Sequence, residues 1–223
     1  MGINERIKQL AGEIDRRSSV ARVEYPLTLV GSPDSYFLRA IKSKADKLHI
    51  PCQISDTAAL TIYPVVIDTE TSDLRSDTPT WSEWDIDSLT VGSEYKMSSV
   101  AEACATLIAD TVPLAGLTVT IVGRGHAVKG LAQWLIDHDA TVTVAHSKTT
   151  DLTSECANRD VVIYATPRLT QCIPYDTRTL VIDLGNCVPR PAFFCCPYTN
   201  RIGALTTSIL LNRVVQKEGH CCV

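Results

Sequence analysis

The chain has 223 residues and a formal net charge of −4, and its lysines and arginines form no basic stripe, which excludes a nucleic-acid-binding footprint. No apolar stretch reaches the length of a membrane span, and the charged N-terminal residues MGINERIKQL are unlike a signal peptide. We therefore expect a cytoplasmic protein whose partners include neither nucleic acid nor a membrane.

The nine cysteines are scattered and lie mostly inside apolar segments. This is typical of free thiols in a reducing compartment and not of a disulfide framework. Neither their spacing nor their distance from histidines along the chain fits a zinc site, so we expect no metal.

The front part of the chain predicts a small α/β unit. Apolar residues recur at helical spacing in three segments, and β-rich runs form three others. The predicted helices cover residues 3–16, 35–49 and 99–110, and the predicted strands cover residues 25–30, 50–54 and 59–67. Asp34 or Ser35 is the expected N-cap of the second helix. Residues 68–84 are polar and predict a loop or linker.

The stretch from Leu117 to Thr150 predicts a βαβ unit. Its β-branched run at residues 118–122 ends in a glycine turn, a helical pattern follows at residues 128–138, and a second β-branched run covers residues 140–145. Such a unit holds a dinucleotide pyrophosphate over a helix N-terminus, with Gly123 and Gly125 in the turn. The third glycine of the GxGxxG pattern is replaced by Val128, so a crossover without a ligand remains an alternative.

The residues after the second strand indicate which dinucleotide would bind. An NAD site usually has an acidic residue there for the ribose 2′-hydroxyl, but the first carboxylate after this strand is Asp151. Arg124, Ser147 and Lys148 instead suit a 2′-phosphate. The pattern therefore favours NADP, and a solvated polar turn is the alternative.

Two more buried strands are predicted at residues 160–165 and 180–185, and a closing helix begins at Thr206. We expect an α/β protein with a Rossmann-like dinucleotide-binding domain at residues 111–205. A second, smaller α/β substrate lobe would comprise residues 1–110 and the C-terminal helix 206–218.

The central segment VGRGHAVKGLAQWLIDHDATVTVAHSKTTDL resembles the cofactor-domain signature of the methylenetetrahydrofolate dehydrogenase/cyclohydrolase (FolD-type) family. Residues 140–144 and 146–149 match that signature residue for residue. The resemblance implies an NADP-dependent oxidoreductase of one-carbon metabolism with cyclohydrolase activity and a folate substrate. We also expect a homodimer.

The resemblance extends more faintly outside the central segment and implies roles for further residues. In the helix after Val30-Gly31-Ser32, Lys42 falls on the family's catalytic lysine, while Leu38 replaces the family's tyrosine. The other implied roles are substrate binding by Tyr36, Asp87 and Gly203, and cofactor binding by Asn186 and Thr206. The family's glutamine-containing strand and its PCTP motif are absent, and Pro167 replaces a cofactor-facing glycine.

Three functions remain open from the sequence. In a folate enzyme the cofactor would perform the hydride transfer, and Lys42 would carry the proton that the hydrolysis of a methenyl bridge requires. A diverged relative would bind NAD(P) without processing folate. A structural scaffold would have little reason to keep Arg124 and the sequence HSKT.

Overall fold

The structure, a computed structural model, describes residues 1–19, 23, 26–55, 64–67, 85–88, 93–169, 173–189 and 196–219. Its helices are α1 (Ile3–Ser18), α2 (Tyr36–Lys47), α3 (Ser99–Thr111), α4 (Leu131–Ile136), α5 (Leu152–Cys156) and α6 (Gly203–Gly219). Its strands are β1 (Leu27–Val30), β2 (Cys52–Ser55), β3 (Val65–Ile67), β4 (Thr118–Val122), β5 (Thr141–Ala145), β6 (Val161–Tyr164), β7 (Leu180–Asp183) and β8 (Tyr198–Thr199). Within the described ranges, no helix combines the length and the apolar character needed to cross a membrane.

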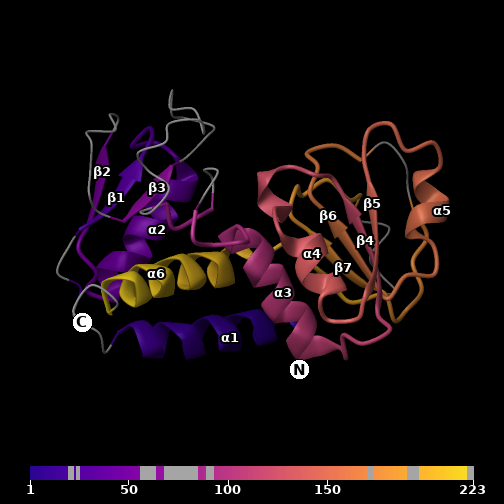
Figure 1. The fold of residues 1–223 in the computed structure, drawn as a ribbon, viewed down its shortest axis with the longest axis horizontal. Coiled ribbons are helices and arrows are strands. Elements are labelled where there is room, and N and C mark those ends of the chain that lie inside the picture. Colours follow the sequence, from indigo (N-terminus) through magenta and orange to yellow (C-terminus); the bar gives the residue numbers. More distant parts are fainter. Residues whose placement is uncertain are drawn as a thin grey trace. The chain divides into compact units, whose positions relative to one another are not determined.

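The chain divides into two compact units (Figure 1). The five-stranded unit comprises residues 1–8 and 100–203, and the three-stranded unit comprises residues 9–99 and 204–223. The sequence predicts a boundary at residue 110, whereas this division assigns residues 100–110 and 1–8 to the five-stranded unit. Each unit is described by itself below.

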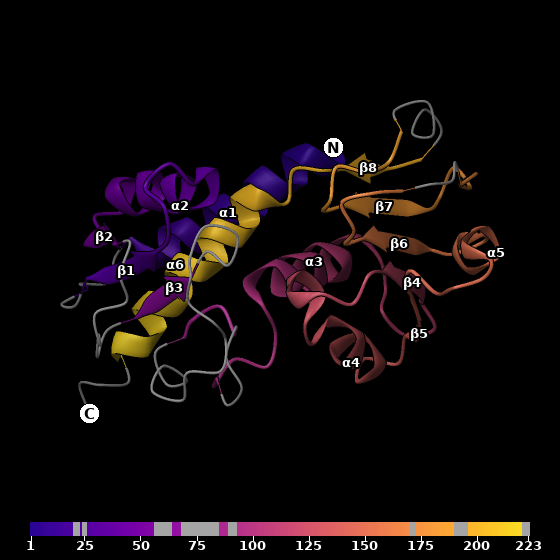
Figure 2. The ribbon, with the colours of Figure 1, turned by 90° about the horizontal axis from the view of Figure 1, so that it is seen from above.

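The five-stranded unit is a doubly wound parallel sheet. Its strand order is β5-β4-β6-β7-β8, and every neighbouring pair is parallel. Figure 2 shows α4 on one side of this sheet and α5 on the other. The chain leaves β4 first to one edge and then to the other, so the strand order reverses between β4 and β6. The predicted Rossmann-like α/β fold is confirmed.

The inner strands of this sheet are apolar on both faces because helices cover both faces. All residues of β6 and β7 are buried, and so are four of the five residues of β4. Strand β5 lies at the edge of the sheet and keeps only Ala145 buried. The sequence therefore predicts the central strands well, because their β-branched runs need no polar face.

The predicted helix at residues 128–138 is shorter in the structure. Residues His126–Val128 form a 3₁₀ turn, and α4 begins only at Leu131. Between them Gly130 has a φ of 81°, a left-handed conformation that ends the turn before the α-helix can start. The apolar spacing locates the helix, but Gly130 within that pattern delays the start of the α-helix to Leu131.

The three-stranded unit is a smaller parallel sheet with the order β2-β1-β3. Its core joins β1, α2 and α6 through the buried residues Leu27, Leu29, Leu38, Ile41, Ala45, Leu210, Leu211 and Val214. Ser35 is the N-cap of α2, since its Oγ accepts a hydrogen bond from the Leu38 N–H at 3.2 Å. Of the strand predicted at residues 59–67, the structure shows β3 at Val65–Ile67. Residues 59–63 of that prediction and the loop predicted at residues 68–84 lie outside the described residues.

A buried arginine of α6 holds the segment that leads into α3. The Arg213 guanidinium donates to the carbonyl oxygens of Ile86 at 2.7 Å and Met97 at 3.0 Å. It also lies 4.4 Å from the centroid of the Tyr95 ring. Because Arg213 is only 3% exposed, these carbonyl groups have little access to water as an alternative partner.

Replacing Arg213 by Leu should therefore destabilise the protein. The change removes two charge-assisted hydrogen bonds and leaves two carbonyl groups unsatisfied, so we expect a loss of about 2–4 kcal/mol in the free energy of unfolding. Urea denaturation measures it. Arg17→Leu in α1 removes an exposed arginine and is the control, with an expected change within about 0.5 kcal/mol. An Arg213→Leu variant as stable as that control contradicts the assignment.

Candidate functional site

A cavity of about 760 Å³ lies where the strand order of the five-stranded unit reverses. In open α/β sheets this carboxyl-end crevice is the preferred place for a ligand. Three loops supply its wall, and they follow β4, β5 and β6. The lining residues are Val122, Gly123, Arg124, His146, Ser147, Thr149, Leu152, Ala165, Thr166, Pro167, Arg168 and Leu169.

The glycine turn brings the ends of β4 and β6 close together. Gly123 has a φ of 118°, which disfavours residues with a side chain. A Cβ on Gly123 would lie 2.9 Å from the carbonyl carbon of Ala165 and closer still to its oxygen. Gly125 differs, because it has a φ of −78° and a Cβ there would meet no atom within 4 Å. Gly123 thus serves the fold, while Gly125 leaves open space beside the cavity.

The cavity is electropositive. Arg124 and Arg168 line it together with His146, and none of the lining residues is acidic. Both arginines are exposed, and neither forms an ion pair with a described carboxylate. Two unpaired guanidinium groups without a competing carboxylate suit an anionic ligand, particularly one with phosphate groups.

The turn after β5 fixes Ser147 at the rim of this cavity. The His146 N–H donates to Thr149 Oγ1 at 2.9 Å, and the Thr149 N–H donates to the His146 carbonyl oxygen at 2.8 Å. The Lys148 N–H donates to His146 Nδ1 at 3.1 Å. These bonds close residues 146–149 into a tight turn, of which His146, Ser147 and Thr149 line the cavity.

The loop after β7 is held by a buried carboxylate. Asp183 Oδ1 accepts from the Cys187 N–H, and Oδ2 accepts from the Val188 N–H, both at 3.0 Å. The Tyr198 hydroxyl also donates to Oδ2 at 3.1 Å. In the same loop, Asn186 has a φ of 49° and accepts a hydrogen bond from Asn200 Nδ2 at 2.8 Å.

The structure thus brings together three of the predicted cofactor residues, because Gly123, Arg124 and Ser147 all line the cavity. Gly125 and Lys148 directly adjoin lining residues without lining it themselves. Asn186 is in the same unit but is not a lining residue. Thr206 belongs to the three-stranded unit, where it is buried in α6.

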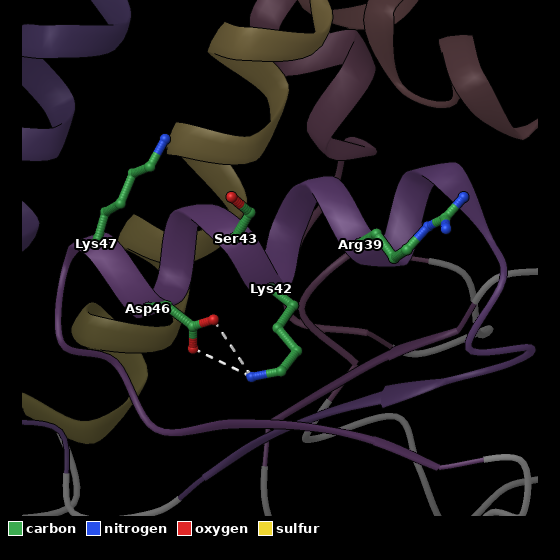
Figure 3. A pocket seen from close by; sticks show the side chains of 5 residues that line it. All are labelled: Arg39, Lys42, Ser43, Asp46 and Lys47. Atoms are coloured by element: carbon green, nitrogen blue, oxygen red, sulfur yellow. Dashed lines mark hydrogen bonds and ion pairs between the residues drawn. The ribbon is translucent and has the colours of Figure 1, made fainter.

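Lys42 lies on α2 of the three-stranded unit, at a shallow pocket lined by residues of that helix (Figure 3). Its Nζ is 3.1 Å from Asp46 Oδ1, one helical turn away, and 3.4 Å from the Cys52 carbonyl oxygen. Figure 3 shows Lys42 and Asp46 pointing toward each other, while Lys47 points away. The Lys42 side chain is 40% exposed, and its ammonium group contacts both Asp46 and the Cys52 carbonyl oxygen of β2.

None of the other predicted substrate residues lines the pocket at Lys42. Asp87 is buried, and its Oδ1 accepts from the N–H and the hydroxyl of Ser99 at 2.8 and 2.6 Å. That carboxylate therefore satisfies the first turn of α3. Tyr36, the first residue of α2, is exposed, and Gly203 is the exposed first residue of α6.

The sequence of the chain matches a known protein family. The tetrahydrofolate dehydrogenase/cyclohydrolase NAD(P)-binding domain matches residues 98–221, more than half of the chain. The chain belongs to the tetrahydrofolate dehydrogenase/cyclohydrolase family. The predicted family resemblance is therefore confirmed.

Individual relatives align with only part of this family member's chain. Bifunctional protein FolD 1 of Rhizobium meliloti (strain 1021) is 44% identical over 82 residues, which are 35% of this chain and 27% of that protein. Bifunctional protein FolD of Clostridium botulinum (strain Eklund 17B / Type B) is 31% identical over 153 residues, or 57% of this chain and 54% of that protein. The chain thus spans about half or less of the length of these relatives.

A solved structure has the same fold as this family member. The methylenetetrahydrofolate dehydrogenase-cyclohydrolase of Trypanosoma brucei, complexed with NADP cofactor and inhibitor, superposes with a TM-score of 0.75. The likeness covers 100% of this chain and 98% of that one at 19% sequence identity, and so it concerns the fold alone.

Arg168 is a residue of this dehydrogenase/cyclohydrolase family member that the sequence motifs do not single out. In the loop after β6 only Pro167 stands out, as a departure from the family's glycine. A signal was available, because Arg168 is a cation soon after a buried strand. Parallel strands that neighbour each other end at the same edge of the sheet, so a residue after β6 lies near the glycine turn after β4.

None of the described cysteines of this family member lines the cavity. The five described cysteines are all free thiols, at residues 52, 104, 156, 187 and 196. Burial raises the pKa of Cys156 to about 11 and, with the Asp183 carboxylate beside it, that of Cys187 to about 12. Both thiols are therefore protonated at neutral pH and are poor nucleophiles.

The two glycines of the turn should respond differently to alanine. Gly123→Ala combines an unfavourable φ with overlap against Ala165, so we expect a loss of about 2–4 kcal/mol in the free energy of unfolding. Gly125→Ala has room and an ordinary φ, so its stability should stay within about 0.5 kcal/mol of the wild type. Chemical denaturation of both variants measures this. Equal stabilities of the two variants contradict the described turn.

Proposed function

We propose that this chain is an NADP-dependent methylenetetrahydrofolate dehydrogenase and methenyltetrahydrofolate cyclohydrolase of one-carbon metabolism. The observation that carries the proposal is the carboxylate-free cavity at the switch point, in which Arg124 and Ser147 meet the glycine turn. The family membership supports it, as does the name of the FolD relatives as bifunctional proteins.

The cofactor half of the proposal follows from the cavity. The pyrophosphate of NADP would lie over Gly123 and Gly125, where the backbone leaves space for a ligand. Arg124, Ser147 and Lys148 would bind the 2′-phosphate at the β5 side. Asn186 and Thr206 are proposed as further cofactor contacts. When bound, NADP supplies the acceptor for a hydride, and the chain's own residues hold and orient it. The NADP in the Trypanosoma brucei structure agrees with this choice of cofactor.

The substrate half assigns proton transfer to Lys42. Its ammonium group is partly exposed and is held by Asp46 and the Cys52 carbonyl, so it can exchange a local partner for a substrate at small cost. Such a group can donate and accept the protons that hydrolysis of a methenyl bridge requires. Tyr36, Asp87 and Gly203 are proposed to contact the folate.

Hydrogen bonds within the protein at two of the proposed substrate-site residues favour a second candidate function. Asp87 Oδ1 is already engaged by Ser99, and Lys42 is already paired with Asp46. Both contacts explain these residues without a substrate. They favour a relative that binds NADP but has lost or changed its folate chemistry.

The organisation of the protein is part of the proposal. The five-stranded unit would be the NAD(P)-binding domain, and the three-stranded unit, with α6, would be the folate lobe. We further propose a homodimer located in the cytoplasm. Gel filtration with light scattering tests the dimer, and a monomer at micromolar concentration contradicts it.

Separate titrations of the wild type with NADP and with a folate analogue test the proposed function. Binding of both, with turnover of methylenetetrahydrofolate, supports the enzyme. Binding of NADP without binding of the folate analogue supports the relative. Binding of neither contradicts both proposals.

Replacing Arg124 by Ala should reduce the preference for NADP over NAD. The guanidinium would make charge-assisted hydrogen bonds to the 2′-phosphate, which NAD lacks, so we expect the ratio of the two affinities to fall by about tenfold or more. Calorimetric titration measures both dissociation constants. Arg178→Ala removes an exposed arginine of the same unit outside the cavity and is the control. A wild type with equal affinity for both cofactors contradicts the assignment.

Replacing Lys42 by Met should remove cyclohydrolase turnover, because methionine keeps the apolar stem but carries no proton. Stability should change by less than about 1 kcal/mol, since the lost ion pair is partly exposed, and NADP affinity should be unchanged. Lys96→Met removes an exposed lysine of the same unit outside the pocket at Lys42 and is the control, which should retain turnover. Full cyclohydrolase activity in Lys42→Met contradicts the role of Lys42.

A further inference from the structure

The turn after β4 leads only into short helical segments. In dinucleotide sites of this fold, a long helix begins at the glycine turn, and its free N–H groups bind the pyrophosphate. Here the N–H groups of Val128 and Lys129 are bonded within the 3₁₀ turn, to the carbonyl oxygens of Gly125 and His126 at 3.2 and 2.9 Å. The α-helix that follows, α4, has only six residues. The helix dipole at this turn is therefore small, and a positive charge from elsewhere in the cavity would strengthen the binding of a pyrophosphate.

Arg168 is placed to supply that charge. It lies on the loop after β6, which is the other side of the switch point from β5, and it lines the same cavity as Gly123 and Arg124. Its backbone is fixed by Thr166, whose Oγ1 donates to the Arg168 carbonyl oxygen at 3.2 Å and accepts from the Arg168 N–H at 3.5 Å. Pro167 further restricts this loop. The guanidinium is exposed and forms no ion pair with a described carboxylate.

The order of the strands separates the two phosphate positions. The 2′-phosphate belongs at the end of the strand after the glycine-turn helix, which is β5, where Ser147 lies. Neighbouring strands are about 4.8 Å apart, so the ends of β5 and β6, with β4 between them, are separated by roughly 10 Å. Arg168 is therefore on the pyrophosphate side of the cavity.

We propose that Arg168 binds the pyrophosphate of the dinucleotide and replaces the contribution that a longer helix N-terminus would make. This inference rests on the proposed NADP binding and adds a residue with a different role from Arg124. Arg124 distinguishes NADP from NAD through the 2′-phosphate. Arg168 strengthens the binding of both cofactors equally, because both contain the pyrophosphate.

The test compares Arg168→Gln with the wild type by calorimetric titration of four ligands. NADP and NAD contain the pyrophosphate, ADP contains it without nicotinamide or a 2′-phosphate, and adenosine 2′-monophosphate contains only the 2′-phosphate. We expect the affinities for NADP, NAD and ADP to fall by about tenfold or more and by similar factors. The affinity for adenosine 2′-monophosphate and the ratio of NADP to NAD affinity should stay at the wild-type values.

Two controls separate binding from folding and from net charge. The bonds that fix this loop join Thr166 to the backbone of Arg168, so Arg168→Gln should keep the thermal unfolding midpoint of the ligand-free wild type. Arg178→Gln removes the same charge from an exposed side chain outside the cavity and should keep all four affinities.

The outcomes distinguish this inference from the proposed function. If the wild type binds both dinucleotides and Arg168→Gln binds them equally well, the role of Arg168 is contradicted and the proposed function stands. If Arg168→Gln weakens NADP but not NAD, Arg168 contacts the 2′-phosphate and the proposal is also contradicted. If the wild type binds neither dinucleotide, both the proposed function and this inference fail.

Discussion

The parallel pairing of β4 with β5 on one edge and with β6 on the other is the constraint on which the candidate site depends. Parallel strands end at the same edge of a sheet, so the three loops that follow them must meet there. The loops can meet closely because Gly123 has no side chain and its backbone packs against Ala165. The cavity, the two arginines and the polar turn at residues 146–149 all follow from this arrangement.

Charge then determines what the cavity can hold. Three other arginines of this unit form ion pairs within the protein: Arg6 pairs with Asp110, Arg159 with Glu155 and Arg178 with Asp176. Arg124 and Arg168 instead face a space without carboxylates. The proposed substrate residues differ from them, because Lys42 and Asp87 have local partners that satisfy them without a ligand. The case for cofactor binding is therefore physically stronger than the case for folate chemistry.

The sequence predicts those features that depend on residues close together along the chain. The β-branched runs locate β4, β6 and β7, and the apolar spacing locates α1, α2 and α3. It fails where one residue overrides a pattern, as when the left-handed Gly130 shortens the helix after the glycine turn. Arg168 could not be recognised from spacing alone, because its proximity to Arg124 depends on which strands are neighbours in the sheet. The family motif gave Arg124 and Ser147 directly, because their positions are fixed relative to the glycine turn.

The central claim is that the switch-point cavity of the five-stranded unit binds NADP, with its two phosphate positions on opposite sides of β4. A crystal structure of the protein with NADP tests it most directly. The account predicts the 2′-phosphate within hydrogen-bonding distance of Arg124 and Ser147, and the pyrophosphate over Gly123 and within hydrogen-bonding distance of Arg168. A cofactor bound outside this cavity, or one with its 2′-phosphate on the β6 side, would contradict the account.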